Sequence, residues 1–106
     1  MCTAISYKTD NLYFGRTLDY EHTFGESITI TPRNFALHFA DIGTMDKHYA
    51  IIGMAHVSNN YPLYYDALNE KGLCIAALNF VGNAHYRERK PCTDNIAHYE
   101  LILWLL

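Results

Sequence analysis

The chain has 106 residues, which suits one ordinary domain and is too short for two. Half of the residues are hydrophobic and 18% are charged, so the composition excludes a highly charged disordered chain. The formal net charge is −3, with eight basic and eleven acidic residues. Because the sequence has no basic stripe, we expect no nucleic-acid partner.

The two ends of the sequence carry no targeting or membrane-spanning signal. Residues 1–10 (MCTAISYKTD) lack a basic region and a long apolar run. The apolar run at residues 101–106 (LILWLL) is far too short to span a bilayer. We therefore expect a cytoplasmic protein with no membrane partner. Because the sequence stops inside an apolar helical pattern, we also expect it to be part of a longer protein.

The first half of the sequence predicts strands. Thr3–Tyr7 and Leu12–Gly15 alternate around a polar turn and predict a β-hairpin. Ser27–Thr31 is rich in β-branched residues and predicts a strand, which Pro32 ends. We expect Asn34–Phe39 to be its partner across the turn at residues 32–33.

The middle of the sequence predicts buried strands. The apolar run Tyr49–Ala55 predicts a central strand, with a close backbone approach at Gly53. Leu63–Leu68 predicts another strand, and it leads into a turn at residues 69–72. Leu73–Phe80 predicts a strand that is buried on both faces.

The last part of the sequence predicts an irregular segment and then a helix. Residues 81–90 are polar and irregular. Thr93 or Asp94 is a suitable cap for a helix that begins near Asn95. We expect its apolar stripe to comprise Ile96, Tyr99, Leu101 and Leu103. Several strands followed by one helix predict an α+β fold.

Cys2 is a candidate nucleophile. Its small side chain permits removal of Met1, which would leave a thiol and a free α-amino group on one residue. An unperturbed α-amino group has a pKa of about 7.7–8.0, so it can act as a base near neutral pH. A thiolate beside such a base is a minimal catalytic pair. The alternative is that Cys2 packs as a small hydrophobic residue.

Three polar residues could assist Cys2. A turn or bulge after Gly15 could bring Arg16 and Asp19 together beside the first strand of the hairpin. The arginine would favour the thiolate, and the aspartate could orient the α-amino group by hydrogen bonding. The alternative is a surface ion pair of little energetic value. Asn79 follows a predicted strand and could donate to an oxyanion, or it could form a local turn.

The remaining cysteines and the histidines predict no metal or disulfide site. Three cysteines (Cys2, Cys74 and Cys92) without a secretory signal do not indicate a disulfide framework. None of the six histidines has the spacing of a helical zinc motif, and no cysteine pair has the C-x-x-C spacing. We expect no metal and no cofactor.

Four motifs occur in order: Met1-Cys2-Thr3-Ala4, then residues 15–19 (GRTLD), residues 69–73 (NEKGL) and residues 78–80 (LNF). Together they closely resemble the choloylglycine hydrolase family of bile salt hydrolases and penicillin V acylases, which are cysteine N-terminal-nucleophile (Ntn) amidases. The resemblance runs over the whole chain and includes residues 32–35 (PRNF) and Trp104.

The resemblance implies a fold and an extent. The family has a four-layer αββα sandwich, of which residues 1–106 resemble only the N-terminal portion, apparently truncated. We therefore expect mainly antiparallel β-structure here, with a truncated C-terminal helix. A second active-site asparagine and a further arginine of the family come from later sequence, so we expect the site in this chain to be incomplete.

The resemblance also implies roles for individual residues. Cys2 is the nucleophile and its freed amine the base, Arg16 and Asp19 are polar partners of that N-terminus, and Asn79 contributes to the oxyanion hole or contacts substrate. The apolar mouth of the site corresponds by position to Leu18, Ser58 and Tyr65, for which ordinary packing or surface exposure is the alternative.

The implied substrate is a small-molecule N-acyl amide. Asn79 favours conjugated bile salts, because acylases of the penicillin V type often have Tyr there. The sequence departs from the common Asn-Phe-Pro-Gly of bile salt hydrolases, since Val81 replaces the proline. Hydrolysis of penicillin V or of an N-acyl homoserine lactone is the alternative within the family. A catalytically inactive fragment that associates with other chains is the alternative outside it. At full length, the family implies a homo-oligomer.

Overall fold

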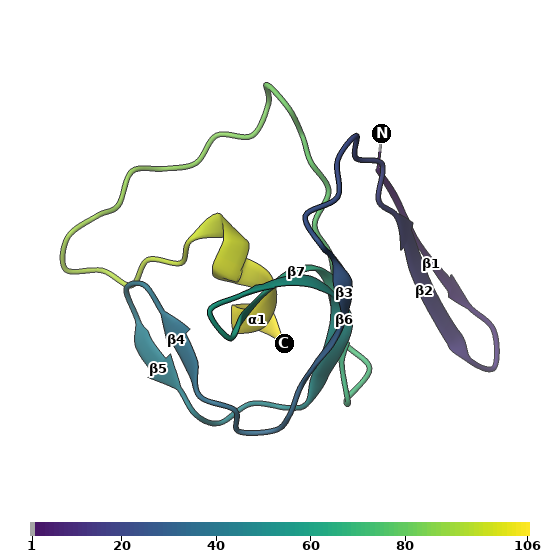
Figure 1. The fold of residues 1–106 in the computed structure, drawn as a ribbon, viewed down its shortest axis with the longest axis horizontal. Coiled ribbons are helices and arrows are strands. Elements are labelled where there is room, and N and C mark those ends of the chain that lie inside the picture. Colours follow the sequence, from purple (N-terminus) through teal and green to yellow (C-terminus); the bar gives the residue numbers. More distant parts are fainter. Residues whose placement is uncertain (1) are drawn as a thin grey trace.

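The computed structural model describes residues 2–106 and consists mainly of antiparallel strands (Figure 1). In this part of the chain, the elements are β1 (Thr3–Lys8), β2 (Leu12–Thr17), β3 (Ser27–Thr31), β4 (Leu37–Phe39), β5 (Gly43–Met45), β6 (Ile51–Ser58), β7 (Tyr61–Asn69), β8 (Cys74–Ala76), the 3₁₀ helix η1 (His98–Glu100) and α1 (Leu101–Leu105).

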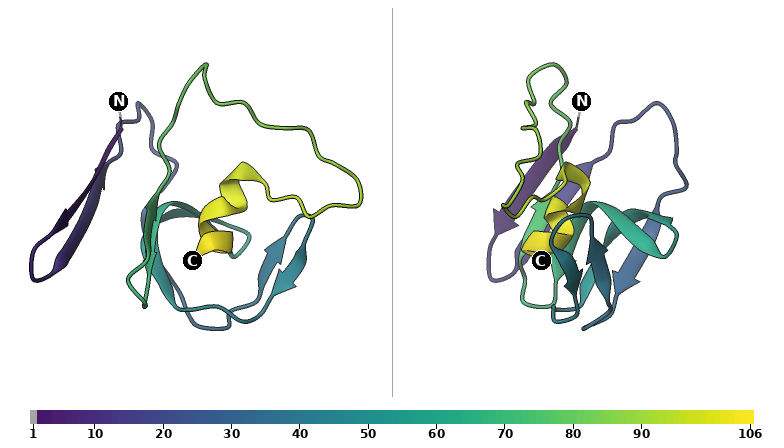
Figure 2. Two further views of the ribbon diagram at one scale, coloured as in Figure 1. Left: turned by 180° about the vertical axis from the view of Figure 1, so that it is seen from behind. Right: turned by 90° about the vertical axis from the view of Figure 1, so that its left-hand side faces the viewer.

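The first two strands form the predicted hairpin. They pair antiparallel from Thr3 opposite Thr17 to Lys8 opposite Leu12. Figures 1 and 2 show that this hairpin lies outside the four-stranded sheet, beside it. All residues of β1 are exposed, and Arg16 of β2 is the hairpin residue that reaches the sheet, at Asp66.

The main sheet has the strand order β3-β6-β7-β8, so β6 and β7 are its central strands. The prediction of a central strand with a close approach at Gly53 is confirmed. A Cβ built on Gly53 would lie 2.0 Å from the backbone oxygen of Asp66 and 2.6 Å from the Cα of Ala67. Only glycine allows β7 to approach β6 this closely.

The prediction that Asn34–Phe39 pairs with Ser27–Thr31 is wrong. β3 pairs with β6 instead, from Ser27 opposite Ala55 to Thr31 opposite Ile51. Asn34 has a φ of 58°, and the chain leaves the sheet there rather than returning along β3. β4 then pairs with β5, and its buried Leu37 and Phe39 join the core.

The prediction for Leu73–Phe80 is also partly wrong. The turn at residues 69–72 is present, and Gly72 has a φ of +88° in it. However, β8 comprises only Cys74–Ala76, and all three residues are half-buried. It is an edge strand, with β7 as its single neighbour in the sheet. Phe80, beyond the end of β8, is 67% exposed.

The helix begins later than predicted. Asn95 does not start it: its Oδ1 accepts a hydrogen bond from the backbone N–H of Lys90 at 3.0 Å, and its Nδ2 donates to the oxygens of Lys90 and Thr93. Residues 91–97 therefore form turns and extended chain, and the helical turns start only at His98. Within the predicted stripe only Leu103 is buried, because the late start changes which residues face the core.

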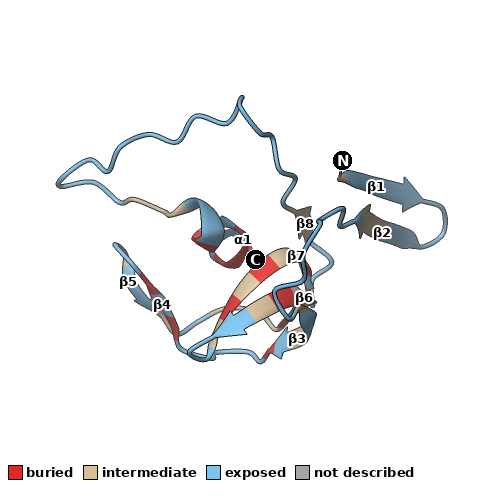
Figure 3. Ribbon diagram, turned by 45° about the horizontal axis from the view of Figure 1, so that its top comes forward, coloured by how far each residue is buried: buried red, intermediate tan, exposed pale blue. Residues whose placement is uncertain are grey.

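The core lies between the sheet, the β4–β5 hairpin and α1. Figure 3 shows the buried positions concentrated on the inner sides of β6, β7, β4 and the helix. The buried hydrophobic residues of the core are Leu37, Phe39, Ile51, Ala55, Tyr64, Ala67, Ile102, Leu103 and Leu106.

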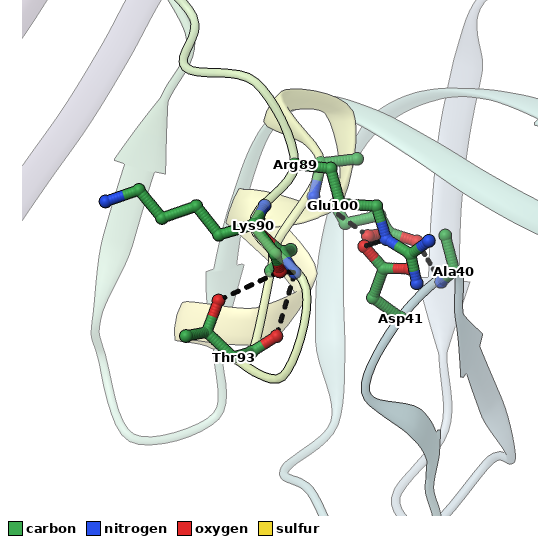
Figure 4. Close-up of polar contacts among 8 residues, drawn as sticks. Ala40, Asp41, Arg89, Lys90, Thr93 and Glu100 are labelled. Atoms are coloured by element: carbon green, nitrogen blue, oxygen red, sulfur yellow. Dashed lines mark hydrogen bonds and ion pairs between the residues drawn. The ribbon is translucent and has the colours of Figure 1, made fainter.

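Two side chains fasten the C-terminal segment to the turn between β4 and β5 (Figure 4). Glu100, which is 2% exposed, accepts hydrogen bonds from the backbone N–H groups of Ala40 at 2.8 Å and Ala97 at 3.1 Å. Arg89 donates from Nε to Asp41 at 3.0 Å, and its Nη2 lies 2.7 Å from the other oxygen of that carboxylate.

Candidate functional site

The candidate nucleophile lies at the open end of the β1–β2 hairpin. The backbone N–H of Thr3 donates to Oγ1 of Thr17 at 3.0 Å, and Sγ of Cys2 lies 4.0 Å from the backbone oxygen of Asp19. Ala4 is opposite Arg16 in the strand register. Cys2 directly precedes β1, so it lies at the end of the hairpin where Ala4 and Arg16 share a face.

Arg16 is almost completely buried, with 6% of its side chain exposed. Its Nη2 donates to the backbone oxygen of Ala77 at 2.5 Å, and its Nε lies 3.6 Å from Oδ2 of Asp66. Nε and Nη1 have no hydrogen-bond partner within residues 2–106. Buried guanidinium N–H groups without partners are costly, so this arrangement leaves donor capacity for a further oxygen or sulfur atom.

The predicted turn after Gly15 is absent, because β2 continues as a regular strand to Thr17. The carboxylate that faces Nε of Arg16 is that of Asp66, on β7. Asp19 follows β2 and contributes its backbone oxygen to the surroundings of the Cys2 thiol. Both residues predicted as partners of the N-terminus thus lie at the same end of the hairpin as Cys2.

Asn79 is exposed in the segment that follows β8. Ala77, two residues before it, donates its N–H to the oxygen of Tyr65 at 2.8 Å and accepts the hydrogen bond from Arg16. Arg16 therefore connects the hairpin that carries Cys2 with the segment that carries Asn79.

A cavity of about 590 Å³ adjoins Arg16. Leu18, Tyr20, Met54 and Asp66 share its wall with Arg16, and the chain at residues 21–23 and Glu26 completes it. The cavity combines apolar side chains with a buried cation and three carboxylates, and such a mixture of apolar and polar groups can bind a small molecule. Of the three residues predicted to bind substrate, Leu18 lies in this wall.

Tyr65 lines a second cavity, of about 390 Å³, with Phe24, His56 and Tyr99 among its neighbours. Burial is the main factor that raises the pKa of Tyr65, and the nearby carboxylate of Glu26 raises it further. The phenol therefore stays protonated at neutral pH and can donate a hydrogen bond. The segment of residues 20–26 contributes side chains to the walls of both cavities.

Ser58 is not brought to either cavity. It is the exposed last residue of β6, at the turn with Asn59 and Asn60. The structure thus places Leu18 and Tyr65 in cavity walls and leaves Ser58 at a strand end.

Asp66 is a site residue that the sequence interpretation missed. It is the acidic residue within the otherwise uncharged strand β7 (YPLYYDALN), and its side chain is 22% exposed. A carboxylate inside a half-buried strand requires a partner, because burial of an unpaired charge is costly. A single acidic residue in an apolar strand is a pattern that could have identified Asp66 from the sequence. The same pattern does not show that Arg16 is its partner.

Residues 2–106 contain neither a group of metal-binding side chains nor a membrane-spanning helix. No three side chains of His, Cys, Asp or Glu in that range lie close enough together to hold a metal ion. Within the same range, no helix is long and apolar enough to cross a membrane.

Comparison with known proteins gives consistent results. Residues 2–106 match the family model for linear amide C–N hydrolases of the choloylglycine hydrolase family. The chain is 55% identical over 106 residues to a bile salt hydrolase/transferase of Lactiplantibacillus plantarum, which covers 100% of this chain and 33% of that protein. It is 42% identical over 109 residues to a conjugated bile acid hydrolase of Lactobacillus gasseri, covering 99% of this chain and 34% of that protein.

A solved structure has the same fold. A mutant of conjugated bile acid hydrolase from Clostridium perfringens superposes with a TM-score of 0.85 at 35% sequence identity, covering 100% of this chain and 33% of that one. This confirms the predicted fold class, the N-terminal part of an Ntn hydrolase with mainly antiparallel strands and a short C-terminal helix. The chain spans about a third of the length of these relatives. The whole-chain match and the high identity show that the chain belongs to the choloylglycine hydrolase family.

Proposed function

We propose that this chain forms the N-terminal third of a cysteine amidase that hydrolyses the amide bond of conjugated bile salts. The observation that carries the proposal is the hairpin end, where Cys2 precedes β1 and the buried Arg16 of β2 adjoins a partly apolar cavity. Relatives at 55% and 42% identity bear the names bile salt hydrolase/transferase and conjugated bile acid hydrolase, which supports the substrate class.

The proposed reaction starts after removal of Met1, which lies outside the described residues. The thiolate of Cys2 attacks the amide carbonyl, and Asn79 with backbone donors stabilises the oxyanion. The α-amino group of Cys2, which takes the thiol proton before the attack, delivers it to the nitrogen of the leaving amino acid, glycine or taurine, as the C–N bond breaks. Water then hydrolyses the thioester, which releases the bile acid and regenerates the thiol.

The positive charge of Arg16 supports the nucleophile in this scheme. Its guanidinium supplies a positive charge at the end of the hairpin that carries the thiol. Asp19 orients the α-amino group, and Leu18 and Tyr65 contribute walls for the apolar ring system of the substrate. These roles, and assembly of the full-length enzyme into a homo-oligomer, are parts of the proposal.

A chimera tests the proposal. Residues 1–106 of this chain replace the matching 106 residues of the Lactiplantibacillus plantarum relative, which supplies the other two thirds. We expect hydrolysis of glycine- and taurine-conjugated bile salts, and a loss of about 1,000-fold or more in kcat for Cys2→Ser, because a hydroxyl is a much weaker nucleophile than a thiolate. Cys92→Ser is the matched control, since Cys92 is exposed and remote from the hairpin. Full activity of Cys2→Ser would overturn the proposal.

Two further measurements define the enzyme. Penicillin V and an N-acyl homoserine lactone are assayed beside the bile salts. Faster turnover of either would contradict the bile salt assignment but would still agree with the proposed amidase mechanism. Intact-mass measurement shows whether Met1 is removed. A protein that keeps Met1 lacks the free α-amino group of Cys2, and hydrolysis by that form would contradict the proposed base.

The second candidate is an inactive chain that associates with other chains. The observation in its favour is the exposure of Ile28 (73%) and Ile30 (66%) on the outer face of the sheet. Assays of the isolated 106-residue chain and of the chimera together separate the two cases, since the second candidate predicts turnover from neither. We expect no turnover from the isolated chain and turnover from the chimera; robust turnover by the isolated chain would exclude the second candidate.

A further inference from the structure

We propose that Asp66 is a positioning residue that holds Arg16 in its place beside Cys2. The proposal rests on the function proposed above and adds a residue to which neither the four sequence motifs nor the comparisons assign a role. Asp66 acts through Arg16. Because Arg16 donates a hydrogen bond to Ala77, Asp66 also affects the segment that carries Asn79.

The side chains of Arg16 and Asp66 lie close together. Nε of Arg16 lies 3.6 Å from Oδ2 of Asp66, and Nη2 of the same guanidinium donates to the oxygen of Ala77 at 2.5 Å. Only 6% of the Arg16 side chain is exposed, so water does little to solvate its charge. A buried cation requires a charged or hydrogen-bonded partner, and removal of that partner lets the side chain move or is costly.

A bulge in β7 directs Asp66 towards Arg16. Met54 of β6 is opposite Asp66, but the next residue, Ala55, is opposite Tyr64, so Tyr65 is the extra residue. Before the bulge the buried positions of β7 are Pro62 and Tyr64; beyond it they are residues 67 and 69.

The bulge therefore changes which face Asp66 occupies. With regular alternation, Asp66 would share the core-facing side with Tyr64, where a carboxylate would be costly. The extra residue instead turns it to the outer face, against which the β1–β2 hairpin lies. Bulges commonly redirect a side chain near a functional site in this way.

Asp66 is itself held from a second direction. Its Oδ1 accepts a hydrogen bond from the backbone N–H of Met54 at 3.4 Å, at the position where the register shifts. Of the other carboxylates in the cavity wall, that of Glu26 is engaged by Thr23 at 2.5 Å and by the N–H of Phe24 at 3.1 Å. Asp66 is thus fixed to the sheet on one side and faces Arg16 on the other.

The test uses Asp66→Asn in the chimera. Asparagine keeps the size of the side chain and an oxygen for the N–H of Met54, but it removes the charge opposite Arg16. We expect kcat to fall by about 10- to 100-fold with little change in KM, because a small displacement of a group beside the nucleophile has effects of this size. Asp66→Glu restores the charge and is expected to recover part of the activity.

Glu70→Gln is the matched control. Like Asp66, Glu70 accepts a backbone hydrogen bond, from Ala50 at 3.1 Å, and pairs with an arginine, Arg33. It lies at the end of β7 away from the cavity that contains Arg16. We expect kcat and KM within about twofold of the parent. A similar loss in both variants would show that any broken ion pair of this sheet has the same effect, and would overturn the proposal.

A double-mutant cycle separates positioning from folding. Arg16→Lys keeps the charge but removes the planar fork. If Asp66 acts through Arg16, adding Asp66→Asn or Asp66→Glu to Arg16→Lys lowers kcat much less than the same change does in the parent. Equal losses in both backgrounds would overturn the proposal. The Asp66→Glu cycle serves alone if thermal unfolding shows that Asp66→Asn does not fold.

The outcomes distinguish this inference from the proposed function. A folded parent chimera that hydrolyses none of the amides contradicts the proposed function. An active parent in which Asp66→Asn retains full kcat contradicts only the role of Asp66.

Discussion

At the scale of single residues, Gly53 gives the most direct stability prediction. A Cβ there would meet backbone atoms of β7 at 2.0 and 2.6 Å, and backbone cannot move aside as a flexible side chain can. We expect Gly53→Ala to lower the free energy of unfolding by about 3 kcal/mol or more, measured by urea denaturation. Gly15→Ala is the control, because nothing lies within 4 Å of its added Cβ. Equal midpoints for the two variants would contradict the close approach.

Glu70 gives a prediction of pH dependence. The hydrogen bond from Arg33, with that from the N–H of Ala50, lowers the pKa of Glu70 from 4.5 to about 2. A carboxyl group with a depressed folded-state pKa adds stability above its unfolded pKa of about 4.3, and this contribution is lost as the pH falls from about 5 towards 2.

The matching experiment follows thermal unfolding from pH 7 to pH 2. We expect Glu70→Gln to have a lower unfolding midpoint than the parent at pH 7, and the gap to close as the pH falls. A gap that stays constant down to pH 2 would show that the charge of Glu70 does not contribute.

The site residues were predictable to different degrees. Cys2, Arg16 and Asn79 lie in short motifs of residue types suited to amide hydrolysis, so the sequence pointed to them, although their roles stay predictions. Asp66 has no such motif. Its partner Arg16 is far away in the sequence, on β2, and the two meet because the hairpin lies beside the sheet and the bulge at Tyr65 turns Asp66 outwards.

At the scale of elements, Glu100 joins the start of the helical segment to the β4–β5 turn. Its buried carboxylate satisfies the N–H groups of Ala40 and Ala97 (Figure 4). We expect Glu100→Ala to cost about 1–3 kcal/mol in urea denaturation, because two partly buried N–H groups lose their charged acceptor. Glu100→Gln, which keeps one acceptor oxygen, should cost less. Glu88→Ala, at an exposed position, is the control and should stay within about 0.5 kcal/mol of the parent.

The elements that were predicted correctly depend on local sequence. The β1–β2 hairpin has its turn and both alternating strands within 15 residues, Thr3–Thr17. β3 was correctly located, but its partner β6 begins 20 residues beyond its end, so the nearer strand was chosen wrongly. The helix start was misplaced because Asn95 uses its side chain to close a turn at Lys90, a choice that only the tertiary context reveals.

At the scale of the whole molecule, two apolar surfaces lie on the outside. The β1–β2 hairpin exposes Ile5 (64%) and Tyr13 (58%), and the outer face of the sheet exposes Ile28 and Ile30 on β3. Figure 3 shows this exposure over the hairpin and over much of β3. Contiguous exposed apolar surface favours association, and the chain spans only a third of its relatives' length. We expect the remaining two thirds of the proposed full-length enzyme to cover the outer face of the sheet.

This arrangement predicts opposite behaviour of the isolated chain and the chimera. We expect the 106-residue chain to bind a hydrophobic dye and to associate with increasing concentration, whereas the chimera binds much less dye per molecule. Ile30→Lys should weaken association of the isolated chain about tenfold or more, because burial of an isoleucine is worth about 1.5–3 kcal/mol. In the chimera the same change should lower the unfolding temperature, since the lysine would be buried.

Sedimentation of the isolated chain is the decisive measurement, with Val81→Lys as the control. Val81 is 79% exposed in the segment after β8, so the same new charge there lies off the sheet and should leave association unchanged. Equal weakening by both lysines would mean that net charge alone governs association. An isolated chain that stays monomeric and binds no dye would show that the outer face needs no cover, and the proposal that the remaining two thirds packs on it would fail.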